Sequence, residues 1–426
     1  MTAQSSTLSA MRVYVATVPL TDTHEHLNPE TVWLEKPPHL AHFFPHYASS
    51  DLVSAGMPPA DLNAVKGEQL SHDEAWKLIE PYWERSRNTT YCKSIDIAIR
   101  DLFGLPGLSR DTYKPLMERM LEAKRPGWYR EVLRERANIE VSILDKTFVN
   151  DRSMYVPIYR FDDYITASSR SHLYDLSMNT GVGIYSLDDL LKALDVAFDK
   201  AAENRPAGVK VGLAYSRTLF FDHVARHDAE VIFNRAFRQR GEGACWEESK
   251  PLQDYMFHQV MRRAMERGWP VQIHTGLQEG NGNFISDSDP VLLSNIFLMY
   301  KKLRFDVFHA GFPYSRELSV LAKNFPNVYP DMCWMHIIGA KPARNILDEW
   351  LDLIPANKIL AFGGDYRFVE GIYAHACIAR ENVSRVLADR VDRGDQTMDE
   401  AKYIAERILR LNARELFGID EKRLQE

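Results

Sequence analysis

The chain of 426 residues has only four cysteines, Cys92, Cys245, Cys333 and Cys377, and they are widely scattered. They form no Cys-x-x-Cys zinc motif and give no basis for a disulfide framework, so a reducing cytoplasm is the expected compartment. No uninterrupted apolar run is long enough to span a bilayer. The first residues lack the basic start of a signal peptide, and the apolar run that follows them ends at Asp22. We therefore expect a cytoplasmic protein without a membrane partner.

A large excess of one charge is also missing. The formal net charge is −7, with 26% charged and 45% hydrophobic residues, as in a folded globular protein. This balance gives no electrostatic footprint for nucleic acid, so a small molecule is the expected partner. No glycine-rich dinucleotide or phosphate loop follows any apolar run, which disfavours a doubly wound open sheet.

Short apolar runs alternate with helical segments along most of the chain. We predict eight strands, at residues 13–20, 139–144, 155–159, 208–213, 270–273, 305–308, 328–333 and 359–362. The clearest helix is predicted at 186–204, with Ser186 as its N-cap, and two long helices at 369–389 and 398–416. Such alternation demands a parallel sheet covered by helices. The sequence therefore predicts a single (β/α)8 TIM-barrel domain over 1–426, with its active site at the carboxyl ends of the strands.

Residues 28–137 break this alternation. They contain helical segments at 71–85, opened by a capping box at Ser71, and at 111–124. We interpret them as a helical insertion after the first strand, lying over the catalytic face. The aromatic and histidine residues between Trp33 and Tyr47 are expected to line the pocket or a subunit contact. A homo-oligomer is the expected assembly, with a related second subunit as the alternative.

Polar residues that could bind a metal lie at or near the ends of the predicted strands. His24 and His26 end the first strand and share a face, roughly 6.5–7 Å apart along the chain, because side chains alternate. The others are Lys210 in the fourth strand, His274 after the fifth, His309 after the sixth and Asp365 after the eighth. Each histidine alone could be an ordinary core or surface residue. Together, imidazoles and a carboxylate converging in a barrel predict a site for zinc, iron or manganese.

The segments DTHEH, VKVG, VQIHTG, VFHAG and GGD resemble the amidohydrolase superfamily. They are most similar to the amidohydrolase-related branch of decarboxylases, lactone hydrolases and uronate isomerase-like proteins. The resemblance covers nearly the whole chain and is strongest over 270–365. It implies that His24, His26 and His274 are metal ligands and that Asp365 is a ligand or a water-orienting base. His309 would be a catalytic histidine or a ligand of a second metal.

Lys210 decides whether one or two ions are expected. An ammonium group inside a barrel must be paired or neutralised. In dinuclear members of the superfamily that the chain resembles, the lysine of the fourth strand is carboxylated and bridges two metals. Lys210 could instead form a salt bridge, for example to Asp145, or hold a substrate carboxylate. Zinc is the first expectation for the metal, with iron or manganese as alternatives.

Residues that could contact the substrate follow several strands. Arg160 and Arg217 offer bidentate clamps for a carboxylate, or equally well salt bridges that stabilise a loop. His336 and Tyr366 follow the seventh and eighth strands and could line the same pocket, as could Trp334, Arg367 and Glu279.

The reaction predicted first is hydrolysis of a small amide, ester or lactone by a metal-activated water. Asp365 would take the proton of the water, and His309 would stabilise charge on the substrate oxygen. Three alternatives remain: non-oxidative decarboxylation of a small carboxylic acid, oxygenation at a dinuclear non-haem iron or manganese site, and a non-enzymatic subunit that supports a partner.

Overall fold

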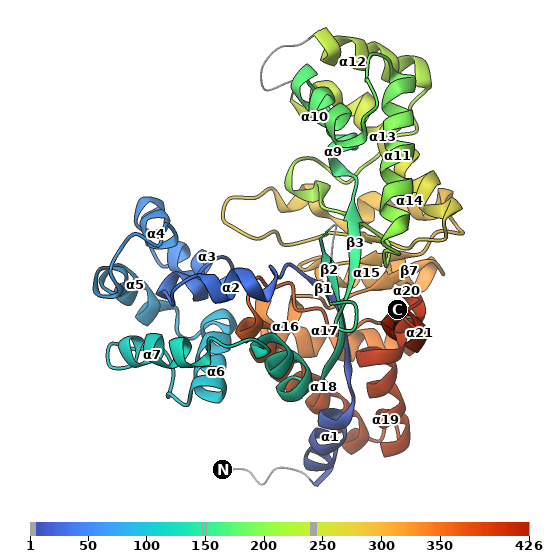
Figure 1. The fold of residues 1–426 in the computed structure, drawn as a ribbon. Helices are drawn as coiled ribbons and strands as arrows, with labels where there is room; N and C mark the ends of the chain where they lie inside the picture. Colours follow the sequence, from blue (N-terminus) through green and yellow to red (C-terminus); the bar gives the residue numbers. More distant parts are fainter. Residues whose placement is uncertain (1–5, 147–148, 150, 239–244, 426) are drawn as a thin grey trace. The chain divides into compact units, whose positions relative to one another are not determined.

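The computed structural model describes residues 6–146, 149, 151–238 and 245–425. Its contacts divide the chain into two compact units. The first unit consists of Met1–Leu144, Gln278–Asn283 and Asp331–Arg414, and the second of Asp145–Leu277, Phe284–Pro330 and Glu415–Glu426. Parallel strands alternate with helices along the chain (Figure 1), which confirms the TIM-barrel class predicted from the sequence.

In its described part, the first unit contains two strands and most of the helices before residue 145 and after residue 330. Its elements are α1 (Ser6–Thr17), β1 (Leu20–Glu25), α2 (Glu30–Glu35), η1 (Leu40–Phe43), α3 (Ala48–Ser54), α4 (Pro59–Lys66), α5 (His72–Ser86), α6 (Thr90–Phe103), α7 (Tyr113–Ala123), α8 (Trp128–Arg130), η2 (Glu131–Arg136), β2 (Ile139–Asp145), α16 (Met335–Ile338), α17 (Ala340–Leu353), η7 (Ala356–Lys358), α18 (Val369–Arg393), α19 (Met398–Glu406), η8 (Arg407–Leu411) and α20 (Asn412–Phe417), whose end extends into the second unit.

The start of the first strand was predicted wrongly. Residues 13–17 belong to helix α1, and β1 begins only at Leu20. Met11 and Val15, four residues apart, are fully buried, whereas Val13 is 71% exposed. This is helical spacing, and it outweighs the strand preference of the β-branched residues. The two histidines nevertheless remain at the carboxyl end of the strand.

Residues 28–137 form the helical insertion that was predicted. Helices α3 to α7, blue to cyan in Figure 1, pack against one another. The capping box at Ser71 is present, because its hydroxyl accepts from the Glu74 N–H while the Glu74 carboxylate accepts from the Ser71 N–H. The core of the insertion is aromatic and includes Trp83, whose indole N–H donates to the Leu108 carbonyl over 2.9 Å.

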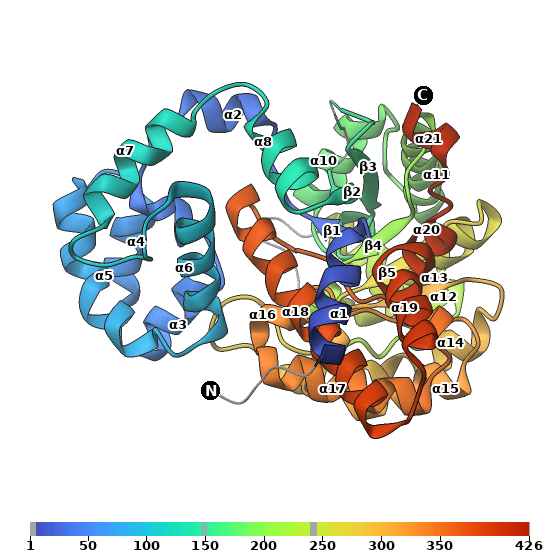
Figure 2. The same ribbon diagram turned by 90° about the horizontal axis from the view of Figure 1, so that it is seen from below.

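The long helix α18 is the centre of the first unit. In Figure 2 it lies beside α1 and α19, and it also contacts α6 and α17. Its Arg380 donates to the backbone carbonyls of Val18, Ala137 and Asn138 just before β1 and β2. These bonds tie the starts of both strands to one buried helix.

Among the described residues, the second unit holds the other five strands. Its elements are β3 (Tyr155–Arg160), α9 (Asp162–Ile165), α10 (Arg170–Thr180), α11 (Leu187–Glu203), β4 (Val209–Val211), η3 (Leu213–Tyr215), α12 (Arg226–Arg238), α13 (Trp246–Glu266), β5 (Val271–Ile273), η4 (Ile285–Ser288), η5 (Pro290–Leu293), α14 (Ser294–Met299), β6 (Phe305–Val307), η6 (His309–Gly311), α15 (Ser315–Asn324), β7 (Val328–Pro330) and α21 (Glu421–Gln425).

Strands β3 to β7 pair in parallel and in chain order. Val209, Val271, Phe305 and Val328 form one row across β4 to β7. Strands β4 to β7 are only three residues long. A polar residue that follows one of these strands therefore lies close to the last ladder hydrogen bond of that strand. Because the strands are parallel, these residues gather at one edge of the unit.

The predicted eighth strand, 359–362, is reduced to one parallel bridge between Leu360 and Asp331. The Ala361 N–H donates instead to the Ile408 carbonyl, and the Phe362 carbonyl accepts from the Thr23 N–H. The C-terminal helical segment therefore takes one of the bonds that a regular ladder would use.

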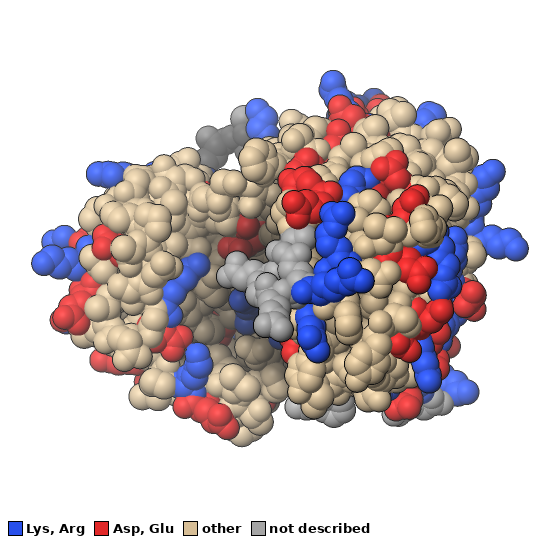
Figure 3. All heavy atoms as spheres, turned by 90° about the horizontal axis from the view of Figure 1, so that it is seen from above, with Lys and Arg blue, Asp and Glu red and all other residues tan. Residues whose placement is uncertain are grey.

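Within the described residues, no helix combines the length and apolar character needed to cross a membrane. On the face shown in Figure 3, Lys and Arg side chains are interspersed with Asp and Glu.

Candidate metal centre

The carboxyl end of β1 carries two adjacent imidazole rings. All six residues of β1 are buried. His24 belongs to the strand and His26 follows it closely, and their ring centroids are 4.8 Å apart with nearly perpendicular planes. The His24 side chain is 1% exposed and the His26 side chain 27%. Solvent therefore reaches the pair from the side of His26.

Asp365 approaches the same place from the loop before α18. Its backbone N–H donates to the His24 carbonyl over 2.8 Å, and the Tyr366 carbonyl accepts from the His26 N–H over 3.0 Å. The loop thus runs alongside the end of β1 and holds the aspartate next to both histidines.

Two glycines make this close approach possible. A Cβ on Gly363 would collide with the Thr23 hydroxyl, and a Cβ on Gly364 would collide with the Glu25 carboxylate. Asp365 itself has a left-handed φ of 60°, which is uncommon for a residue other than glycine. The GGD segment is therefore required by packing as well as by the carboxylate that it presents.

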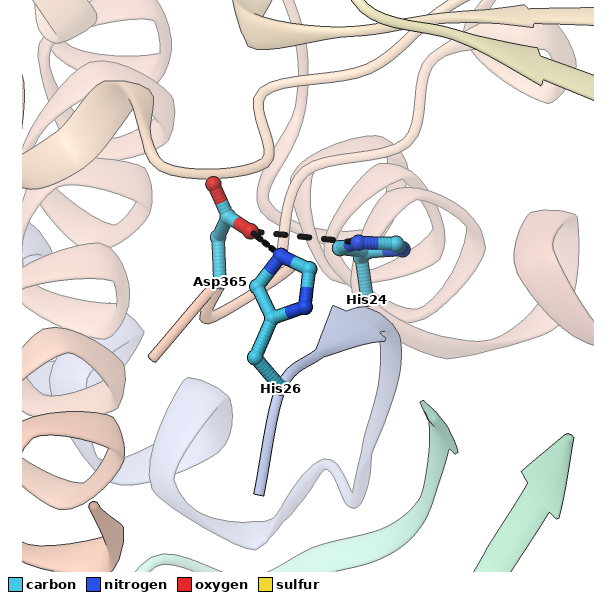
Figure 4. Close-up of side chains that lie close together, drawn as sticks. All are labelled: His24, His26 and Asp365. Atoms are coloured by element: carbon cyan, nitrogen blue, oxygen red, sulfur yellow. Dashed lines mark ion pairs between the residues drawn. The ribbon is translucent and has the colours of Figure 1, made fainter. Parts of the chain in front are cut away.

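The side chains of His24, His26 and Asp365 converge (Figure 4). Asp365 Oδ1 is 3.0 Å from His26 Nε2 and 3.9 Å from His24 Nε2. One ligand atom from each residue lies within 4.8 Å of the others. Two nitrogens and one oxygen at this spacing, partly open to solvent, fit a divalent ion such as zinc, iron or manganese with room for further ligands.

Two buried carboxyl groups support the loop from behind. Asp22 accepts from the Gly364 N–H over 3.0 Å and from the Ser142 hydroxyl over 2.7 Å, and Glu25 accepts from the Tyr366 N–H over 2.7 Å. Burial raises the pKa of Asp22 to about 6. Burial, together with the nearby charge of Asp22, raises the pKa of Glu25 well above its usual value. Glu25 carries no signal in the sequence, because a strand residue between two histidines points away from them.

The insertion contributes aromatic residues beside Asp365. The Tyr47 hydroxyl donates to the Asp365 carbonyl, and its ring stacks on Trp334 at 4.7 Å. His46 lies against Tyr47 at 4.0 Å and is 5% exposed. Neither ring nitrogen of His46 has a hydrogen-bond partner among the described residues. Burial lowers its pKa to about 3, so this histidine is neutral.

Three charged residues, Lys66, Glu279 and Arg367, affect the electrostatics of this part of the first unit. Burial raises the pKa of the Glu279 carboxyl, and the charges of Lys66 and Arg367 partly oppose that rise. Burial also lowers the pKa of Lys66. The charges of Lys66, Arg367 and the half-buried Glu279 therefore influence one another, and the charge of Asp365 also acts on Glu279.

In the second unit, His274 and His309 form a pair. His309 Nε2 is 3.0 Å from His274 Nδ1, and His274 Nε2 is 3.0 Å from the Leu277 carbonyl oxygen. His309 has a left-handed φ of 60°. Both side chains are buried and follow the carboxyl ends of β5 and β6, the positions predicted from the sequence.

Lys210 in β4 is 2% exposed, and its ammonium group lies over the Phe308 ring at 3.6 Å. Asp162 is half-buried and accepts from the Gly212 N–H over 2.8 Å. Burial raises the pKa of Asp162 to about 6, although the charges of Arg160 and Lys210 oppose the rise. Whether Lys210 is carboxylated stays a prediction.

The amidohydrolase family profile matches residues 200–419, slightly more than half of the chain. The chain belongs to the amidohydrolase family. It is also 28% identical over 233 residues to protein fluG of Emericella nidulans. That match covers 53% of this chain but only 27% of protein fluG, so the chain spans about a quarter of the length of this relative.

Solved structures share the fold of this amidohydrolase. A uronate isomerase from Thermotoga maritima matches with a TM-score of 0.80 and 18% identity, covering 97% of this chain and 98% of that one. A protein from Lactobacillus casei described as a metal-dependent hydrolase matches with a TM-score of 0.68 and 19% identity, covering 98% and 99%. At these identities the likeness concerns the fold.

The two arginines predicted to bind substrate are both in ion pairs. Arg217 is fully buried and bonds Asp254 over 2.6 Å and Gln253 over 3.1 Å. The Arg160 side chain is 39% exposed. Its Nη2 and Nε atoms both bond Asp145 Oδ2, at 2.5 and 2.8 Å respectively. These contacts favour the loop-stabilising alternative for Arg217, while Arg160 remains accessible to a ligand.

His336 and Tyr366 are buried. His336 Nε2 is 2.9 Å from the Ala361 carbonyl oxygen, and its Nδ1 is 3.2 Å from the Asn382 amide nitrogen. Both ring nitrogens of His336 are thus occupied within the fold. The Tyr366 hydroxyl bonds the Ser94 hydroxyl over 3.1 Å, and its ring packs against His46.

Proposed function

We propose that this amidohydrolase is a metal-dependent hydrolase that acts on a small amide, ester or lactone. The convergence of His24, His26 and Asp365 carries the proposal. A divalent ion held there, with zinc as the first choice and iron or manganese as alternatives, lowers the pKa of water toward about 7 and polarises a carbonyl oxygen. One ion is the minimum, and carboxylation of Lys210 would provide for a second.

Asp365 is the proposed base. Its Oδ1 faces both imidazoles, whereas Oδ2 points away from them (Figure 4). Oδ2 is the oxygen that we propose accepts the proton of the attacking water and passes it to the leaving group. The bond from the Asp365 N–H to the His24 carbonyl fixes the carboxylate during this transfer. His274 as a ligand and His309 as a stabiliser of the substrate oxygen complete the proposal.

The surroundings of Asp365 favour a substrate that carries a carboxylate. Lys66 and Arg367 supply positive charge, and the neutral His46 supplies a ring nitrogen that can donate a hydrogen bond. A carboxylate placed there would offset the burial that lowers the pKa of Lys66. Arg160 is a further proposed carboxylate ligand, since its side chain is partly exposed.

Isomerisation of a sugar acid is the second candidate, and the neutral His46 next to Asp365 is the observation that favours it. A base and a separate proton donor on one site can move a hydrogen between adjacent carbons. A uronate isomerase shares this fold over nearly the whole chain. Decarboxylation and dinuclear iron or manganese oxygenation use the same ligands and are distinguished by the experiment below.

The experiment is a substrate screen by NMR on protein reconstituted with zinc, manganese or iron. The panel contains N-acyl amino acids, lactones, hydroxybenzoates and uronates. Run in H2 18O, hydrolysis places 18O in the acid product; run in D2O, isomerisation places deuterium on carbon. Release of CO2 would identify a decarboxylase, and oxygen consumption an oxygenase. The hydrolase proposal is wrong if turnover occurs without 18O in the product.

A further inference from the structure

The second unit contains a cavity of about 500 Å³ at the amino-terminal ends of its strands. Its walls come from the segments before β4, β5 and β6 and from the residues that follow α20. His274 and His309 follow the opposite ends of β5 and β6. The cavity is therefore separated from those candidate catalytic histidines by the length of the strands.

The cavity is strongly basic. Its charged lining consists of Arg205, Arg267, Arg304, Arg423 and Asp420. Four guanidinium groups thus face one carboxylate. Arg267 also bonds Asp199 outside the lining over 2.6 Å. The remaining positive charge is not balanced by the acidic side chains of the cavity wall.

The partners of two of these arginines are neutral. Arg423 donates to the backbone carbonyls of Phe417 and Arg205. Arg304 donates to the carbonyls of Glu415 and Gly268 over 3.3 and 3.4 Å. Both Arg304 bonds are long, and a guanidinium has five donors. Arg304 can therefore turn donors toward a ligand at little cost.

Capping of helix ends is the simpler explanation of these bonds. The carbonyls lie near the carboxyl ends of α11, α13 and α20, where each helix dipole carries roughly half a negative charge. Three such ends offset about 1.5 charges, whereas the four arginines, less Asp420 and the Asp199 that pairs with Arg267, leave two positive charges. Burial and the charges of Arg205 and Arg152 also lower the pKa of Arg423 to about 10.

We propose that this cavity binds a small, multiply charged phosphate-type anion, through Arg304, Arg423 and Arg205. Planar guanidinium groups match phosphate oxygens with paired hydrogen bonds. The volume falls within the range of small-ligand sites. Such an anion joins the segments before β4, β5 and β6 to the C-terminal helix α21, which lies beside the end of α11 in Figure 2. It acts on the stability of the barrel and does not take part in the reaction.

Isothermal titration of the metal-loaded protein with phosphate and pyrophosphate, at fixed ionic strength, tests the proposal. Saturable binding is expected for the wild type. Arg304→Gln should weaken it about tenfold, the effect of losing one charged hydrogen-bond donor. Asp420→Asn should strengthen binding several-fold, because it removes the acidic charge and keeps an oxygen for the Arg423 N–H. Arg119→Gln, on the exposed surface of α7, is the matched control and should bind like the wild type.

Opposite effects of Arg304→Gln and Asp420→Asn would establish the cavity as the binding site. The proposal is overturned if the wild type shows no saturable binding. It is equally overturned if Arg304→Gln binds like the wild type, since pyrophosphate would then be binding elsewhere, for example at the catalytic metal.

Discussion

The backbone N–H of Asp365 donates to the carbonyl oxygen of His24 over 2.8 Å. This bond joins residues 341 positions apart and sets the carboxylate beside two imidazoles. The candidate metal centre depends on the backbone as much as on its three side chains, because the loop has to lie against the strand before the side chains can meet.

Replacing both histidines tests the metal centre most directly. We expect His24→Ala with His26→Ala to remove the bound divalent ion, because two of the three converging ligand atoms are lost. The barrel should remain folded, as the β1 backbone and its pairing with β2 are unchanged. Metal analysis after gel filtration is the measurement, with circular dichroism for the fold. His227→Ala, an exposed histidine on α12, is the control. Wild-type metal content in the double variant would contradict the assignment.

The close approach of the GGD loop predicts a strong effect for one added methyl group. In Gly364→Ala the new Cβ collides with the buried Glu25 carboxylate. We expect a loss of stability of about 1–3 kcal/mol, typical of overpacking, and weaker metal binding because the loop is displaced. Gly67→Ala, where the nearest atom to a Cβ is 3.4 Å away, is the control and should change stability little. Urea unfolding measures both, and equal midpoints would show that the loop tolerates the displacement.

Much of the fold could be predicted from the hydrophobic periodicity of the sequence and from its helix caps. The N-cap at Ser186 and the helix after it, α11, were predicted nearly to the residue. Helix α1 was not, because its β-branched residues favour a strand while burial of Met11 and Val15 against α18 favours a helix. The end of the barrel at 359–362 depends on a bond to Ile408, which no local pattern reveals.

The residues of the candidate site also fall into two groups, those that the sequence reveals and those that only the folded structure reveals. His24, His26 and Asp365 could be found because their residue types and their positions after apolar runs are visible in the sequence. Glu25 and His46 could not, because their importance comes from buried contacts with Tyr366 and Tyr47. His336 looked like a pocket residue only because it follows a strand, and its ring is instead bonded to Ala361 and Asn382.

His336 predicts a specific dependence of stability on pH. Burial lowers its pKa to about 4 from an ordinary value near 6.5. Between these values the unfolded chain binds a proton that the folded protein does not. The free energy of unfolding should therefore fall as the pH decreases from about 6.5 to about 4, by roughly 3 kcal/mol from this group, and this contribution should be constant outside that window.

His336→Gln removes this titration. We expect lower stability at pH 7, by roughly 1–3 kcal/mol for disturbed buried hydrogen bonds, but a shallower decline toward pH 4. KM should be unchanged, since the ring is occupied within the fold. Urea unfolding between pH 4 and 7.5 is the measurement, with His227→Gln as the exposed control. An unchanged pH slope would show that His336 is not the titrating group, and a raised KM would restore it as a substrate residue.

The two arginines should separate into different roles. Arg217→Met leaves the Asp254 carboxylate buried without its main partner, and we expect a loss of about 3–5 kcal/mol in stability with normal KM for the folded enzyme. Arg160→Gln breaks a partly exposed pair, so stability should change by about 1 kcal/mol or less. If Arg160 holds a substrate carboxylate, its KM should rise about tenfold. Thermal unfolding and steady-state kinetics distinguish these outcomes, and the reverse pattern would exchange the two roles.

Asp365→Asn should reduce catalysis more than it reduces metal binding. The amide is nearly isosteric and keeps an oxygen at the position of Oδ1, 3.0 Å from His26 Nε2, so the ion can still be held, although more weakly. The bond from residue 365 to the His24 carbonyl is a backbone bond and survives the change. The amide cannot accept a proton, which removes the proposed base. We therefore expect kcat at saturating metal to fall by at least about 10²-fold, the usual scale for loss of a general base. Metal affinity and kcat are measured separately by titrating metal into the apo-variant during turnover. Recovery of wild-type kcat at high metal concentration would make Asp365 a ligand only, and the proton would have to be taken by another group.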